Sequence, residues 1–178
     1  MWERICKVVM MNMNNPIKIE NMLKEDWEQV EQIYLEGIKT GNATFQQEVP
    51  TWEEWDQSHV KECRLVAKTN GVILGWCALS PVSSRCVYNG VAEVSVYVGA
   101  NSKGAGVGSL LMEALIVASE EQGFWTLQSG IFPENSASIQ LHKKFGFREV
   151  GVRERIGKMN GVWRDNLFLE RRSKIVGI

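Results

Sequence analysis

The stretch that decides the fold is "AEVSVYVGANSKGAGVGSLLMEAL", residues 92–115, in which an alternating segment leads through three glycines into an apolar helix. Gly104, Gly106 and Gly108 stand on alternate positions. Glycine permits a positive φ and lets a bulky group approach the main chain, and a helix start offers unpaired N–H groups and a positive dipole end. The loop therefore predicts a pyrophosphate site, to which Lys103 adds a charge.

Two other glycine motifs fit this loop poorly. A P-loop requires a lysine before its Ser or Thr, whereas Ser109 follows a glycine. A dinucleotide-binding fingerprint follows the first strand of its fold, but this loop comes late in the chain. A flexible connector explains one glycine more easily than three on alternate positions. Phosphate binding is therefore the favoured interpretation.

Composition limits the classes of partner and site. A chain of 178 residues is long enough for one domain with a real core. Twenty Lys and Arg residues against 21 Asp and Glu residues give a net charge of −1, so we expect neither a nucleic-acid partner nor a membrane partner. The two histidines, His59 and His142, form no ligand cluster, so no metal is expected.

The cysteines and the N-terminus bear on location. Cys6, Cys63, Cys77 and Cys86 show no C-x-x-C pair or disulfide spacing, which favours the reducing cytoplasm, and the last three are expected as small core residues. No apolar run approaches the roughly 18 residues of a membrane span, and the start lacks the features of a signal peptide. Residues 1–15 are predicted to be a poorly ordered extension of a single domain at 16–178.

The remaining sequence predicts strands and helices in a definite order. We expect strands at 16–22, 64–69, 72–81, 91–98 and 125–132, helices at 24–41, from Thr51, at 107–122 and at 134–146, and two closing strands around Asn160-Gly161. The order β-α-α-β-β-β-α-β-α-β-β indicates an α+β fold with a mixed, mostly antiparallel sheet flanked by helices.

Two elements carry a clear pattern of faces. In the strand at 91–98, one face carries Ala92, Val94, Val96 and Val98, and the other carries Glu93, Ser95 and Tyr97. In the helix at 107–122, the expected apolar stripe consists of Val107, Leu110, Leu111, Ala114, Leu115 and Ala118.

Four segments resemble those of a known family. "VSVYVGANSKGAGVGSLLMEAL" (94–115) is similar to the acetyl-CoA-binding segment of the GNAT N-acetyltransferases, with a lysine at the usual Gln/Arg position. "PENSASIQLHKKFGF" (133–147) is similar to a later family segment. "SRCVYNGVAEVSVYV" (84–98) and "GKMNGVWRDNLFLE" (157–170) resemble the phosphinothricin and amino-acid acetyltransferase branch. The resemblance implies the GNAT fold over roughly residues 16–171.

The resemblance also implies a cosubstrate and the residues that bind it. Acetyl-CoA would place its pyrophosphate on the glycine loop and its pantetheine arm beside the preceding strand. The implied cofactor-binding residues are Val96, Tyr97, Val98, Lys103, Gly104, Ala105, Gly106, Val107, Gly108, Ser109, Asn135 and Ser138.

Attack on a thioester requires a neutral amine, so a base must remove a proton, directly or through water. Glu93 is the candidate, both from the family match and because the five residues to Val98 span about 17 Å. His142 stands where this branch has a histidine that protonates the leaving thiolate. A thiol pKa near 8.5 makes that acid less important than the base. A backbone N–H near Val96 to Val98 is expected to bind the oxyanion, with direct transfer in a ternary complex.

The branch points to a small amino acid or analogue, such as phosphinothricin or methionine sulfone, as acceptor. Glu93, Phe45, Arg85 and Tyr88 match positions near its substrate pocket, and Arg85 could pair with a carboxylate or phosphinate. Trp163, Arg164 and Asp165 match a further branch motif, and we also expect a homodimer. The alternatives are acetylation of a protein N-terminus or a polyamine, and a non-catalytic acetyl-CoA sensor that would not need Glu93.

Overall fold

The computed structural model describes residues 16–178, and the predicted extension at 1–15 lies outside them. The strands are β1 Lys18–Asn21, β2 Arg64–Thr69, β3 Val72–Pro81, β4 Val91–Val98, β5 Thr126–Ile131, β6 Arg148–Met159 and β7 Val162–Arg172. The helices are α1 Trp27–Lys39, α2 Trp52–Ser58, α3 Val107–Glu121 and α4 Ser136–Lys144. Short 3-10 turns lie at Lys24–Asp26, Lys61–Cys63, Cys86–Tyr88 and Ala100–Ser102. This order confirms the predicted succession of elements.

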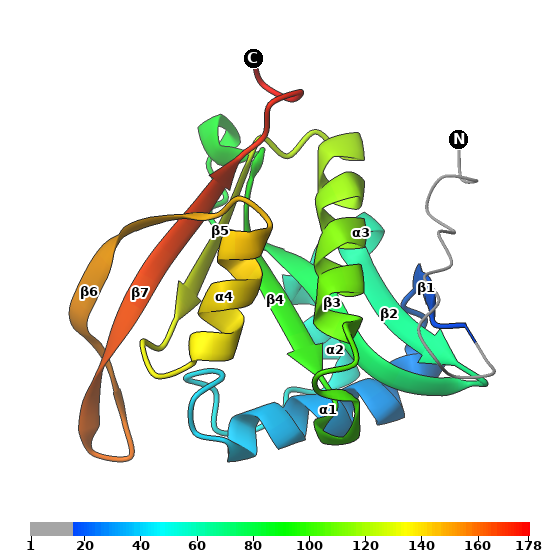
Figure 1. Ribbon diagram of the computed structural model, residues 1–178. Helices are drawn as coiled ribbons and strands as arrows, with labels where there is room; N and C mark the ends of the chain where they lie inside the picture. Colours follow the sequence, from blue (N-terminus) through cyan, green and yellow to red (C-terminus); the bar gives the residue numbers. More distant parts are fainter. Residues whose placement is uncertain (1–15) are drawn as a thin grey trace.

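The strands form one mixed sheet in the order β1-β2-β3-β4-β5-β7-β6. β4 and β5 pair in parallel, and the other neighbours pair antiparallel. Figure 1 shows β4 and β5 diverging from their paired ends, with α4 between them in this view. The α+β prediction is therefore confirmed.

Each face of the sheet buries a separate apolar cluster. One cluster joins β4 residues such as Ala92 and Val94 to α3 and to Phe147 after α4. The other joins α1, Trp55 of α2, Trp76 and Tyr97. The alternating faces predicted for β4 are therefore confirmed, and Trp27, Trp52 and Trp55 pack in contact with one another.

The buried stripe of α3 is rotated from the predicted one. Leu110 and Ala114 are only partly buried, whereas Met112, Ile116 and Ser119 are buried. The helix lies under a twisted sheet and beside α4, so its buried face is wider than an amphipathic pattern indicates. This rotation leaves Leu110 partly buried, close to the exposed glycine loop at the start of the helix.

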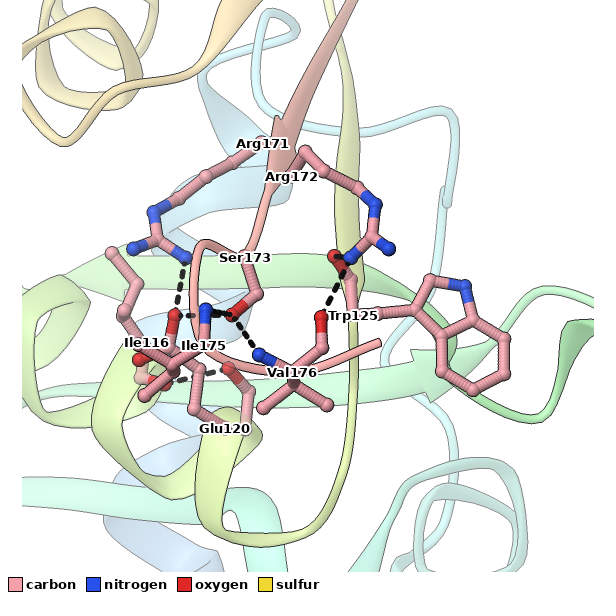
Figure 2. A network of polar contacts seen from close by, with 9 residues as sticks. Ile116, Glu120, Trp125, Arg171, Arg172, Ser173, Ile175 and Val176 are labelled. Atoms are coloured by element: carbon pink, nitrogen blue, oxygen red, sulfur yellow. Dashed lines mark hydrogen bonds and ion pairs between the residues drawn. The ribbon is translucent and has the colours of Figure 1, made fainter. Parts of the chain in front are cut away.

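A polar network fastens the end of the chain to the sheet (Figure 2). Glu120 at the end of α3 accepts hydrogen bonds from Arg171 at 3.0 Å and from Ser173 at 2.9 Å. Arg172 donates to the main-chain oxygens of Trp125 at 2.7 Å and Val176 at 2.9 Å, and to that of Gly177. The segment after β7 is thereby held against the start of β5.

Within residues 16–178, no helix combines the length and apolar character needed to cross a membrane.

Candidate active site

The point where β4 and β5 separate is the structural centre of the site. Their parallel register ends at the pair Glu93 and Gln128, although β4 continues to Val98 and β5 to Ile131. The exposed Glu93 carboxylate accepts a hydrogen bond from the Gln128 amide at 3.4 Å. The candidate base therefore stands at the apex of a wedge between two strands.

Beyond this apex, β4 is paired on one side only. β3 pairs with β4 from Ala92 to Val98, but β5 no longer follows β4 after Glu93. Peptide groups on the open side can therefore pair with an extended ligand that carries amides. A pantetheine arm has this chemistry, and the side chains of Val96 and Val98 supply apolar surface on the α3 side.

Tyr97 differs from its two valine neighbours. Its ring stacks on Trp76 with centroids 4.6 Å apart and meets Tyr34 at 4.9 Å on the opposite face of the sheet. Burial raises the pKa of the Tyr97 hydroxyl above its ordinary value. Only the main chain of Tyr97 is therefore placed for the implied contact with a cofactor.

The glycine loop has the conformation that its sequence predicts. Gly104 and Gly106 both have φ of 80°, in the left-handed region that disfavours other residues. Among the described residues, the N–H groups of Gly104, Gly106, Val107 and Gly108 donate to no backbone acceptor. An anion can therefore bind several amides at the start of α3, which runs for 15 residues.

The absence of a side chain at Gly108 has a different role from the positive φ of Gly104 and Gly106. A Cβ at this position would lie 3.3 Å from Leu141 of α4 and 3.5 Å from Val98 of β4. The missing side chain thus lets α3, α4 and the end of β4 converge around the loop. Lys103 and Ala105 are exposed at the rim of this loop.

Sequence reasoning missed a second cation at the loop. The ammonium of Lys144, at the end of α4, donates a hydrogen bond to Ser109 Oγ at 3.0 Å. Lys144 therefore stands beside the start of α3, although it is 35 positions away in sequence. The loop supplies backbone donors, and Lys144 supplies a positive charge next to them.

The start of α4 places two predicted residues, Asn135 and Ser138, together. Asn135 caps the helix, because its Oδ1 accepts from the Ser138 N–H at 3.2 Å. The Asn135 amide also donates to the main-chain oxygen of Asn42 at 3.1 Å. In the fold itself, Asn135 therefore joins α4 to the loop after α1.

His142 is buried, and both hydrogen-bond contacts of its ring within residues 16–178 are to Ser138, the longer one being to Ser138 Oγ at 3.5 Å. Its Nδ1 lies 2.8 Å from the Ser138 carbonyl, which only accepts, so this nitrogen carries the proton. Nε2 is buried and has no partner among the described residues. Burial lowers the pKa of His142, and the Ser138 carbonyl partly opposes this. The neutral ring thus offers a lone pair, not a proton, at Nε2.

The loop after α1 meets the closing strands near the wedge. Phe45 packs edge-on against Phe132 with centroids 4.7 Å apart, and a Cβ at Gly157 would lie 2.6 Å from the Phe45 ring. Arg164 donates to the Gly41 carbonyl at 3.0 Å. The Phe45 ring therefore packs over the end of β5 and beside Gly157 of β6.

The Arg164 side chain links β7 to the loop after α1 and to Glu134. It also donates to Asn42 Oδ1 at 2.9 Å, pairs with Glu134 at 3.1 Å, and lies 4.1 Å from the Phe132 ring centroid. A cavity of about 670 Å³ adjoins it, lined by residues of the same loop, of 133–134 and of the β6–β7 hairpin. None of the predicted catalytic or binding residues lines this cavity.

Arg85 and Tyr88 lie together between β3 and β4. The guanidinium carbon of Arg85 is 5.7 Å from the Tyr88 ring centroid, and both residues are exposed. Cys86 between them is also exposed, so its expected place in the core was wrong, because this turn projects beyond both strands. Cys63 and Cys77 are buried as predicted.

Across residues 16–178, no group of three or more His, Cys, Asp or Glu side chains is arranged to hold a metal ion.

Comparison with known proteins decides the family. The acetyltransferase (GNAT) family model matches residues 19–147. The chain belongs to the GNAT acetyltransferase family. The chain is 31% identical to a phosphinothricin N-acetyltransferase from Streptomyces coelicolor over 163 residues, which is 87% of this chain and 95% of that relative.

Two further relatives agree with this assignment. A methionine sulfoximine and methionine sulfone acetyltransferase from Pseudomonas paraeruginosa is 33% identical over 100 residues, 56% of this chain and 58% of its own length. The structure of yncA from Salmonella typhimurium, solved with its cofactor acetyl-CoA, superposes with a TM-score of 0.79. It is 26% identical and covers 88% of this GNAT chain and 93% of its own. The predicted family and fold are therefore confirmed, and the protein is a phosphinothricin-acetyltransferase-like GNAT enzyme.

Proposed function

We propose that this GNAT enzyme transfers the acetyl group of acetyl-CoA to the amino group of a small amino acid or amino-acid analogue. The observation that carries the proposal is the wedge between β4 and β5, with Glu93 at its apex and the glycine loop beyond its open end. The coenzyme can enter between the strands while its phosphates stay at the loop.

The residues of the loop fit the diphosphate of the coenzyme. The free amides of Gly104, Gly106, Val107 and Gly108 bind its oxygens, and Lys103 and Lys144 supply positive charge. Val96, Tyr97 and Val98 offer main-chain groups to the pantetheine arm, while Asn135 and Ser138 border it from α4. The remaining predicted contacts, Ala105, Val107 and Ser109, belong to the same turn.

Glu93 acts as the general base that takes a proton from the acceptor ammonium, directly or through one water. A main-chain N–H on β4 between Val96 and Val98 donates to the developing oxyanion. His142 contributes little as an acid, because its Nε2 lacks a proton in the neutral ring and thiolate leaves readily. Transfer is direct and forms no acyl-enzyme.

The acceptor binds on the face of the sheet that carries Glu93. Phe45 forms an apolar wall, and Arg85 with Tyr88 lies at the turn that leads into β4. This placement supports an acceptor that combines an apolar side chain with an anionic group. Relatives named for phosphinothricin and methionine sulfone have acceptors of this kind.

A thiol-release screen tests the proposal. Purified protein with acetyl-CoA would be offered phosphinothricin, methionine sulfone, the common amino acids, polyamines and short peptides, and free CoA would be measured. We expect the highest kcat/KM with phosphinothricin, methionine sulfone or an amino acid. Preference for a peptide or polyamine would refute the acceptor class, and acetyl-CoA binding without turnover of any amine would point to a sensor.

We further propose that the enzyme is a cytoplasmic homodimer. β6 is an edge strand of the sheet and exposes Val150, Val152 and Ile156, each about half accessible. An exposed apolar edge strand is a natural surface for pairing with another copy. Analytical ultracentrifugation would show a dimer, and Val152→Lys would shift it toward monomer.

A further inference from the structure

The sheet face that carries Glu93 continues across three strands that no helix covers. Glu93 pairs with Gln128, and Gln128 pairs with Glu170, so Phe168 and Asn166 on β7 share this face. Arg153 of β6 is the direct partner of Asn166. These side chains lie on the same face of the sheet as the candidate base, which is the face on which we propose that the acceptor binds.

Arg153 is an unpaired cation on this surface. Its guanidinium carbon lies 3.9 Å from the Phe168 ring centroid, and the side chain is exposed. Within the described chain it has no carboxylate or hydrogen-bond partner, whereas Arg148 pairs with Glu170 and Arg164 pairs with Glu134. A guanidinium stacked on a ring keeps its N–H edge free for a planar anion.

Asn166 adds an unsatisfied polar atom beside Arg153. Its Oδ1 is buried and has no hydrogen-bond partner within residues 16–178. The amide lies over Gly130, where a Cβ would come within 2.6 Å of Nδ2 and 2.7 Å of Oδ1. The absence of a side chain at Gly130 therefore makes room for the Asn166 amide. A buried polar atom without a hydrogen bond lowers the stability of the folded protein.

We propose that Arg153 binds the α-carboxylate of the acceptor and that Asn166 Oδ1 accepts a hydrogen bond from its amino group. This inference rests on the proposed amino-acid acetyltransferase function. The Arg153 guanidinium lies over the ring of Phe168, and ordinary strand spacings put the Cα of Phe168 about 12 Å from that of Glu93. An amino acid together with the side chains of Arg153 and Glu93 can bridge this distance. The amine then points toward Glu93, and Arg85 is available for a side-chain anion such as a phosphinate.

The first test removes the guanidinium and compares two acceptors. These are methionine sulfone and the methylsulfonylpropylamine that remains when its carboxylate is removed. Arg153→Gln should lower kcat/KM for methionine sulfone about 10- to 100-fold through KM, and should leave the value for the amine and KM for acetyl-CoA within about twofold. Lys158→Gln is the matched control, because Lys158 is exposed on the same strand and stacks on Trp163 on the opposite face. Equal losses with both acceptors, or no loss with either, would overturn the proposal.

The second test removes the unsatisfied amide. Asn166→Leu preserves size, so its melting temperature should be unchanged or higher, while KM for both acceptors should rise about three- to tenfold. A lower melting temperature with an unchanged KM would assign Asn166 a purely structural role and overturn its part in the proposal.

Calorimetric binding of methionine sulfone in the presence of CoA separates this inference from the proposed function. Wild-type protein that binds it without acetylating it would refute the function, and loss of that binding in Arg153→Gln would still support the carboxylate site. Wild-type protein that acetylates only peptides or carboxylate-free amines would overturn the site and leave acetyl transfer intact. Failure to bind any amino acid would overturn both.

Discussion

The amide of Gln128 donates a hydrogen bond to the carboxylate of Glu93 at the last register pair before β4 and β5 separate. This contact ties the orientation of the candidate base to the point where the sheet opens. A cofactor inserted into the opening would end at that base. In the proposed function, the strand pairing therefore sets both the path of the coenzyme and the position of the candidate base.

Glu93→Gln should lower kcat/KM by about 10²- to 10⁴-fold, because the amide cannot take a proton from the acceptor. His142→Ala should lower it much less, because the neutral ring has no proton on Nε2 and thiolate is a tolerable leaving group. Steady-state kinetics on both variants makes the comparison. Since His142 is buried, the folded fraction of each variant must be measured by circular dichroism. Equal losses in fully folded variants would contradict these roles.

Lys144→Gln should raise KM for acetyl-CoA about two- to tenfold and leave KM for the acceptor unchanged. The reason is the position of its ammonium at Ser109, beside the unpaired amides of the loop. Lys143→Gln is the control, because the neighbouring Lys143 pairs with Glu149 instead. The rise should shrink at high salt. An equal effect of both substitutions would indicate general attraction rather than a specific contact.

The sequence predicted the elements that local patterns determine. Alternation placed Glu93 and Val96 on opposite faces of β4, and two glycines at positive φ fixed the conformation of the glycine loop. The sequence could not predict the hydrogen bond from Lys144 to Ser109, because that contact depends on how α4 packs on α3. Arg153 was also missed, because an arginine in an edge strand has the same local signature whether it faces solvent or a ligand.

Stability should fall as the pH is lowered from about 7 to about 5.5. Burial lowers the pKa of His59 and of His142, whereas an unfolded histidine titrates near 6.5. The unfolded state therefore binds more protons below about pH 6.5, and stability is lost there, by at most about 1.4 kcal/mol per pH unit for each histidine. Urea denaturation at several pH values measures this slope.

The double variant His59→Gln, His142→Gln provides the control for this pH dependence. Glutamine does not titrate, so the slope between about pH 7 and about pH 5.5 should become shallow. The variant can be less stable at every pH without affecting this comparison. A wild-type protein that gains stability on acidification, or a double variant with the wild-type slope, would contradict the assignment.

Glu120→Ala should lower the free energy of unfolding by about 1–3 kcal/mol. The carboxylate is largely buried and accepts from both Arg171 and Ser173 (Figure 2), so its removal leaves a partly buried guanidinium without its partner. Glu121→Ala is the matched control, because the next residue of α3 is exposed. Denaturant unfolding of both variants gives the two free energies. The loss should leave KM for acetyl-CoA unchanged, since Glu120 lies at the opposite end of α3 from the glycine loop. A raised KM together with unchanged stability would mean that this network holds the cofactor site rather than the end of the chain.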